Sequence, residues 1–130
     1  MALKKSVSEL VAAAEARIER LTPEQARQLL DDPDVRFVDI RDVRELKREG
    51  TVPGALHAPR GMLEFWVDPD SPYHKADFAS GQRFVLFCAL GHRSALATAQ
   101  LMDMGFGPVC DIEGGFEGWR SANGKIEKKS

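Results

Sequence analysis

Apolar residues recur along this chain in two patterns that alternate with each other. Short apolar runs bounded by turn residues are typical of buried strands, whereas apolar positions three or four residues apart are typical of amphipathic helices. The first pattern predicts strands at 36–40, 56–58, 83–87 and 108–112. The second pattern predicts helices at 7–21, 23–30, after Asp42, at 61–67, at 95–104 and after Gly115. Strands that alternate with helices imply an α/β fold whose parallel sheet is covered on both faces.

Two capping boxes mark the helices that precede the first predicted strand. Residues 6–9 begin a helix that is expected to run to Leu21, and residues 22–25 begin another with Pro23 in its first turn. These helices either cover the sheet or form an arm that binds a partner. Packing on the sheet is the plainer interpretation, because short amphipathic helices depend on tertiary contacts for their stability.

Two further segments lack a regular apolar pattern. Residues 68–72 form a loop, and five ring-bearing residues surround it: Phe65, Trp66, Tyr73, His74 and Phe78. They either build a satellite core beneath the loop or line a pocket, since long ordered loops are often functional. The polar tail at 123–130 is expected to fray.

Composition and charge exclude several classes of partner. The chain has 130 residues, which is typical of one domain, with 43% hydrophobic and 29% charged residues and a formal net charge of −2. This balance gives no broad field for nucleic acid or an anionic membrane. Apolar stretches are too short to span a bilayer, and the first five residues lack the apolar core of a signal peptide. We therefore expect a cytoplasmic protein.

Cys88 and Cys110 are the only cysteines, and they lie in different predicted strand contexts. Without C-x-x-C spacing, the sequence does not predict a structural disulfide, although the spacing leaves a transient bridge open. The three histidines and the two cysteines also lack any close ligand pair. The sequence therefore predicts no zinc site.

Cys88 stands where the central apolar run, 83–87, stops and a short loop begins. Gly91 allows the chain to turn tightly before the next helix, so unpaired N–H groups and the positive end of the helix dipole are expected to converge on the sulfur. Such surroundings stabilise a thiolate, and Arg93 adds a positive charge nearby. Cys88 is thus a candidate reactive thiol, the alternative being a cysteine that only packs at the strand end.

Several motifs together resemble the rhodanese-like family of single-domain sulfurtransferases. They are Asp39-Ile40-Arg41 followed by Glu45, Gly50 to Ala55, Cys88 to Ser94, and Gly114-Gly115 with Trp119. Their order and spacing place a rhodanese-like domain at 22–122, with residues 1–21 as an additional helix on or near it and 123–130 as a polar tail.

The resemblance implies a three-layer α/β fold with a five-stranded, mostly parallel sheet. It also implies that Cys88 takes a sulfane sulfur as a persulfide from a donor such as thiosulfate and passes it to a thiol or to cyanide, without a metal or organic cofactor. A sulfur-relay protein is a further candidate partner. The loop that would bind substrate consists of Ala89, Leu90, Gly91, His92, Arg93 and Ser94.

Roles for the neighbouring polar residues follow from the same resemblance. Asp39, Arg41 and Glu45 are expected to brace the loops rather than to take part in chemistry. Arg93 either pairs with an acidic neighbour or faces an anionic substrate, and pairing is favoured. Ser94 is expected to cap the helix and to donate towards the sulfur.

The loop departs from the family pattern at Ala89 and His92, where many members carry Arg. The pocket is therefore less cationic, which weakens thiosulfate as the natural donor more than it weakens persulfide formation. His92 either carries part of a charge near neutral pH or simply faces solvent. Thr51, where the family motif usually has His, says little about the chemistry.

Two other classes of function stay open. Phosphatases and arsenate reductases of the same fold have five residues between Cys and Arg, whereas four separate Cys88 from Arg93 here. A non-catalytic module that binds a partner or senses sulfur or redox state is the other alternative, and the additional N-terminal helix would suit a docking subunit. The presence of Cys88, Gly91 and Arg93 argues against an inactive domain.

Overall fold

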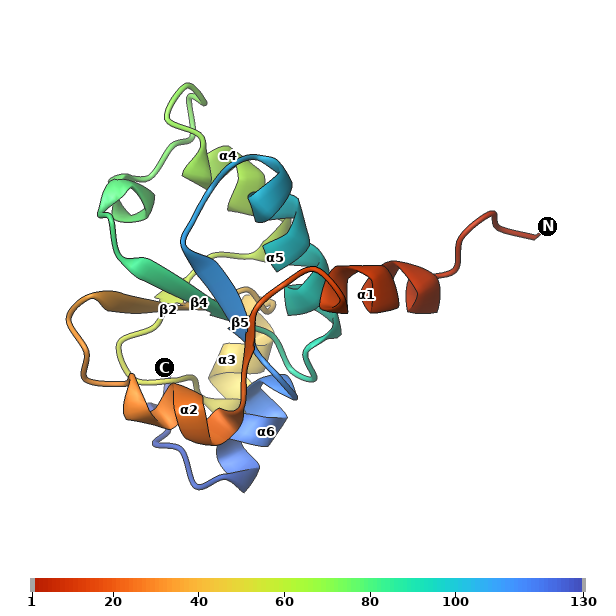
Figure 1. Cartoon of the computed structure of the whole chain (residues 1–130). Coiled ribbons are helices and arrows are strands. Elements are labelled where there is room, and N and C mark those ends of the chain that lie inside the picture. The colour runs from red at the N-terminus through yellow and green to blue at the C-terminus, as the bar shows by residue number, and fades with distance from the viewer. Residues whose placement is uncertain (1, 130) are drawn as a thin grey trace.

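A computed structural model describes residues 2–129 of the chain, and Figure 1 shows it as a cartoon. The strands are β1 (Arg20–Leu21), β2 (Val35–Asp39), β3 (Leu56–His57), β4 (Arg83–Phe87) and β5 (Val109–Ile112). The helices are α1 (Val7–Glu15), α2 (Pro23–Gln28), α3 (Val43–Glu49), α4 (Leu63–Val67), α5 (His92–Asp103) and α6 (Gly115–Ser121), with short 3-10 turns at Arg60–Met62 and Ala76–Ala79.

The five strands form one sheet in the order β1-β5-β4-β2-β3, and every pairing between them is parallel. The central strand is β4, whose last four residues are buried. This is the position expected for the most continuous apolar run of the chain, because a central parallel strand is covered on both faces. The predicted α/β class is confirmed, and the sheet is wholly rather than mostly parallel.

Helices cover both faces of the sheet (Figure 1). One core joins β2 and β4 to α4 and α5 and includes Val38, Leu63 and Leu101. The other core joins β4 and β5 to α2 and α6 and includes Ala26 and Trp119. Among residues 2–129, no helix combines the length and apolar character needed to cross a membrane.

The N-terminal helix is shorter than its apolar spacing predicts. The capping box at Ser6 forms, but α1 ends at Glu15, and Leu21 lies in β1 instead of on the helix. The pairing of β1 with β5 outweighs helical periodicity here, because the carbonyls of Glu19 and Leu21 accept hydrogen bonds from the amides of Asp111 and Glu113 at 3.2 and 2.9 Å. The helix packs on α5 through Ala14, while Val7 is 66% exposed.

Two other helix starts agree with the sequence. Thr22 and Gln25 form the capping box of α2, with Pro23 in its first turn. Asp42 caps α3, and Glu45 completes that box by accepting from the Asp42 amide. Both boxes satisfy N–H groups that the first helical turn leaves unpaired.

The C-terminal segment, which the structure describes as far as Lys129, does not fray as the sequence predicts, and Ser130 lies outside the described residues. The backbone of Glu127 exchanges hydrogen bonds of 2.8 and 2.9 Å with Thr51, forming an isolated antiparallel bridge. Trp119 also donates its indole N–H to the carbonyl of Lys125 at 2.7 Å. The buried tryptophan therefore needs the tail as a hydrogen-bond partner, which explains why this polar segment is ordered.

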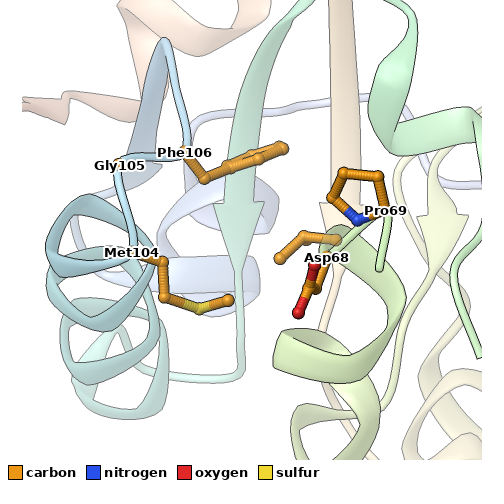
Figure 2. Close-up of a pocket in the computed structure, with 6 residues that line it drawn as sticks. Asp68, Pro69, Met104, Gly105 and Phe106 are labelled. Carbon is orange, nitrogen blue, oxygen red and sulfur yellow. The ribbon is translucent and has the colours of Figure 1, made fainter. Parts of the chain in front are cut away.

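Of the two alternatives predicted for the ring-bearing residues around 68–72, the satellite core is confirmed for Phe78, and none of the five lines the cavity that lies beside this loop. Phe78 is buried and stacks on Phe84, as expected for a satellite core, whereas Phe65 and Tyr73 are 51% and 59% exposed. A cavity of about 400 Å³ lies beside the loop, between the C-terminal ends of α4 and α5. Figure 2 shows Met104 and Phe106 on one side of it, with Asp68 and Pro69 on the other.

Candidate functional site

The Cys88 thiol lies directly beyond the carboxyl end of β4, under a tight loop that leads into α5. Only 1% of the residue is exposed. The backbone N–H groups of Gly91 and Ser94 donate to its Sγ atom at 3.2 and 3.3 Å. These donors and the N-terminus of the twelve-residue α5 bring positive potential to the sulfur.

The loop has this shape because glycine occupies two crowded positions. Gly91 has a φ of +99°, and a Cβ there would lie 2.9 Å from the Arg20 guanidinium. Gly115 has a φ of +60°, and its Cβ would lie 2.5 Å from the carbonyl oxygen of Cys88. That close approach lets the amide of Phe116 donate to the same carbonyl at 2.7 Å. The first turn of α6 therefore holds the Cys88 loop from behind.

A shallow depression of about 180 Å³ opens over Cys88. Its lining residues are Cys88, Ala89, Leu90, His92 and Arg93, so the structure brings the predicted loop residues to one site. Leu90 is 60% exposed and His92 is also exposed, so both stand at the mouth. Asp68 and Pro69 line the cavity at the other end of α5, and no residue of the 68–72 loop lines the depression over Cys88.

Arg93 pairs with Glu45 instead of lying unpaired in the depression. Its Nη1 and Nη2 atoms donate to the two carboxylate oxygens at 2.9 and 3.1 Å. The hydrogen bond with Glu45 raises the pKa of Arg93, and the same contact lowers the pKa of Glu45. This bidentate geometry supports the scaffolding interpretation, in which Arg93 ties the start of α5 to α3.

Asp39 and Arg41 form a separate buried cluster. Arg41 donates to Asp39 through Nε at 3.0 Å and Nη2 at 2.9 Å, and to the Gly50 carbonyl at 2.7 Å. Thr51 donates its hydroxyl proton to Asp39 at 2.7 Å, and the guanidinium lies 4.4 Å from the ring centroid of Phe116. The cluster joins β2, the end of α3 and α6, as expected for bracing residues, whereas Glu45 belongs to the Arg93 pair.

Ser94 departs from its predicted role. It lies inside the first turn of α5, whose N-cap is Gly91, so it does not cap the helix. Its hydroxyl donates to Oδ2 of Asp111 at 2.7 Å, and the Cys88 thiol donates to the Ser94 oxygen at 3.6 Å. A hydroxyl has one proton, so this proton is directed to Asp111 and away from the sulfur.

Sequence reasoning missed Asp111 and Arg20. Asp111 is fully buried on β5, and Arg20 of β1 donates to both of its carboxylate oxygens at 2.9 Å. Asp111 had a signal in the sequence, because an acidic residue inside an apolar strand needs a buried partner. Arg20 had none, since only the parallel register of β1 against β5 sets the two residues side by side.

Metal ligands do not gather in the part of the chain that the structure describes. Among residues 2–129, no three His, Cys, Asp or Glu side chains lie close enough together to hold a metal ion. Both cysteines are free thiols.

Comparisons with known proteins agree with this fold. The family model for the rhodanese-like domain matches residues 22–122. Thiosulfate sulfurtransferase GlpE of Pseudomonas aeruginosa is 33% identical over 106 residues, which cover 79% of this chain and 84% of that protein. The predicted resemblance to the family is therefore confirmed.

Two solved structures are also similar. A protein of unknown function from Rhodopseudomonas palustris, named a possible tyrosine phosphatase, is 46% identical with a TM-score of 0.94 and 98% coverage of both chains. The polysulfide-sulfur transferase homodimer of Wolinella succinogenes is 32% identical with a TM-score of 0.68, and the match covers 92% of this chain and 85% of that one. The motifs, the fold and these similarities together place the chain in the family of rhodanese-like domains.

Proposed function

We propose that this protein is a sulfurtransferase that carries a sulfane sulfur on Cys88. The observation that carries the proposal is the pair of backbone N–H groups, from Gly91 and Ser94, aimed at a buried sulfur beneath an open depression. Donors fixed in this way stabilise negative charge on sulfur without reorganising during the reaction. The names of the sulfurtransferase relatives support the same class of reaction.

In the first step, the Cys88 thiolate attacks the outer sulfur of a donor such as thiosulfate. A sulfur–sulfur bond forms to Cys88 while the sulfur–sulfur bond of the donor breaks, and its electron pair leaves with sulfite. The product is a persulfide whose terminal sulfur carries the negative charge. No net electron is lost, so the step needs no redox cofactor.

In the second step, a thiolate or cyanide attacks the terminal sulfur of the persulfide. The new bond forms to the acceptor, and the electron pair of the broken bond returns to Cys88 as a thiolate. The depression leaves this sulfur accessible from the side of Leu90 and His92. A sulfur-relay protein with a reactive thiol would use the same route.

The pairing of Arg93 with Glu45 supports sulfur rather than phosphate as the transferred group. A phosphoryl group needs several cationic or amide donors spread around a tetrahedral anion. Here both terminal nitrogens of Arg93 bind a carboxylate, and the loop between Cys88 and Arg93 has four residues rather than the five typical of the phosphatases of this fold. We therefore expect no phosphatase activity, despite the name given to the Rhodopseudomonas palustris protein.

Mass spectrometry of the intact protein after exposure to thiosulfate, and separately to a thiosulfonate, tests the proposal. We expect a gain of one sulfur atom, located on Cys88 by peptide analysis and removed again by cyanide. The Cys110→Ser variant serves as the matched control, because it keeps Cys88 and removes the only other thiol.

Two results would contradict the proposal. Absence of added sulfur with both donors would favour a non-catalytic module that binds a partner. Turnover of p-nitrophenyl phosphate that disappears in Cys88→Ser would favour a phosphatase instead.

A further inference from the structure

We propose that Arg20 and Asp111 are positioning residues of the Cys88 site. Together they set the electrostatic potential at the sulfur, and Asp111 determines the direction in which the Ser94 hydroxyl donates its proton. The role of these two residues in sulfur transfer rests on the proposed function, but the ion pair and the hydrogen bonds that they form do not. The two residues form an ion pair in which Asp111 is fully buried and the Arg20 side chain is 16% exposed.

Arg20 connects β5 and the end of α1 to the loop. Its Nε and Nη2 atoms donate to the two oxygens of Asp111, and Nη2 also donates to the Gly91 carbonyl at 2.8 Å. Its Nη1 atom pairs with Glu15 at the end of α1. A single guanidinium therefore fixes the position of Gly91, whose own amide donates to the Cys88 sulfur.

Asp111 acts on the sulfur through one hydroxyl group. It accepts the Ser94 proton, so the lone pairs of the Ser94 oxygen are left for the Cys88 S–H group at 3.6 Å. The carboxylate is separated from the sulfur only by this hydroxyl, in a buried environment where charges are weakly screened. An unpaired carboxylate at this place would oppose a thiolate, and Arg20 cancels that effect.

The other charges near the sulfur do not duplicate this pair. From α5, Arg93 also interacts with Cys88, but it is paired with Glu45 of α3 and its side chain is 44% exposed, and His92 is exposed at the mouth of the depression. Glu113, just beyond β5, is exposed. Arg20 and Asp111 are therefore the buried opposite charges whose separate removal would change the potential at the sulfur in opposite directions.

The pH dependence of alkylation tests this prediction without any need for sulfur transfer. Rates of Cys88 alkylation by iodoacetamide are measured against pH in a Cys110→Ser background, for Arg20→Met, Asp111→Asn and the double variant. We expect the midpoint to rise by about one pH unit in Arg20→Met and to fall by a similar amount in Asp111→Asn. The double variant is expected to return close to the parent.

Opposite shifts that cancel are a signature of charge, which a purely structural loss would not produce. Asn at position 111 keeps an acceptor for the Ser94 proton, so Asp111→Asn decides the question if Arg20→Met does not fold. A midpoint that stays unchanged or rises in Asp111→Asn would overturn the proposal.

Arg17→Gln is the matched control. Arg17 lies three residues before Arg20, and its side chain pairs with exposed Asp103 of α5 instead of with Asp111 or Gly91. We expect its alkylation profile to match the parent, and a shift like that of Arg20→Met would overturn the proposal. Persulfide formation is measured separately, by mass spectrometry. A failure of the proposed sulfur transfer can therefore be told apart from a failure of the proposed charge effect on Cys88.

Discussion

Cys110 lies on β5 and Cys88 directly follows the neighbouring strand β4, and both thiols are almost completely buried. Cys88 stands beyond the end of β4, where it receives two backbone amides and faces a depression. Cys110 lies within β5, and its removal from water raises its pKa to about 11, an effect that Arg83 partly offsets. Burial alone therefore does not separate the two thiols. Beyond the end of a strand, backbone N–H groups are free to donate to a sulfur atom, whereas within the strand they donate to the neighbouring strand.

The largest difference between the two cysteines is expected in activity, when each thiol is removed in turn. Cys88→Ser is expected to lower thiocyanate formation from a sulfur donor and cyanide by about 100-fold or more, because the nucleophile is lost. Cys110→Ser is expected to stay within about twofold of the parent, since Cys110 is buried within β5 and does not line the depression. Comparable losses in both variants would show that the two thiols work together.

Gly115→Ala is expected to disturb the Cys88 loop itself. An added Cβ meets the Cys88 carbonyl at 2.5 Å with φ at +60°, so we expect the free energy of unfolding to fall by about 3 kcal/mol. Urea unfolding measures this loss. Gly54→Ala is the control, because its φ of +75° is similar but nothing lies within 4 Å, so that a loss of only about 1 kcal/mol is expected. Equal losses would mean that the contact with the loop is unimportant.

The raised pKa of Cys110 predicts a stability change at high pH. Burial raises this pKa from 9.0 to about 11, so the folded state keeps the thiol protonated where the unfolded chain would release the proton. The resulting stabilisation is complete below pH 9 and is lost as the pH rises through about 11. The unfolding free energy of the parent relative to Cys110→Ala should therefore fall by about 2 kcal/mol across that range. A constant difference between the two proteins would contradict this assignment.

Glu45→Gln is expected to have the smallest effect. Gln keeps the acceptor for the Asp42 amide but removes the charge that pairs with Arg93, whose side chain is 44% exposed, so we expect a loss of about 0.5 kcal/mol at neutral pH. Because Arg93 lowers the pKa of Glu45, the contribution is present above the ordinary carboxyl range and disappears as the pH falls through the lowered value. Urea unfolding at neutral and acidic pH measures it. A loss that persists in acid would point to packing rather than charge.

The contrast between the cysteines also shows which parts of the site the sequence could predict. The run Arg83–Phe87, then Cys88 and Gly91, was enough to place the thiol at a strand end, because those features are local in the chain. The bracing role expected for Asp39 and Arg41 is also local, since the two residues are separated by one position and pair directly.

Interactions between distant segments were not accessible in the same way. Ser94 was expected to face the sulfur, but Asp111, seventeen positions later, takes its proton. The helix expected to reach Leu21 ends at Glu15, because β1 finds its partner ninety-one positions away, at Asp111. The tail was expected to fray, and the bridge to Thr51 holds it.

The sequence by itself determined the alternation of strands and helices, the caps of α1, α2 and α3, and the identity of the candidate nucleophile. These follow from spacing, capping and turn chemistry within a few residues. Only the tertiary structure decided that Arg93 pairs with Glu45 and that the Arg20–Asp111 ion pair lies next to the Cys88 loop. The physical reason is that buried charges must be paired, and the parallel register of the sheet, rather than proximity in the chain, selects their partners.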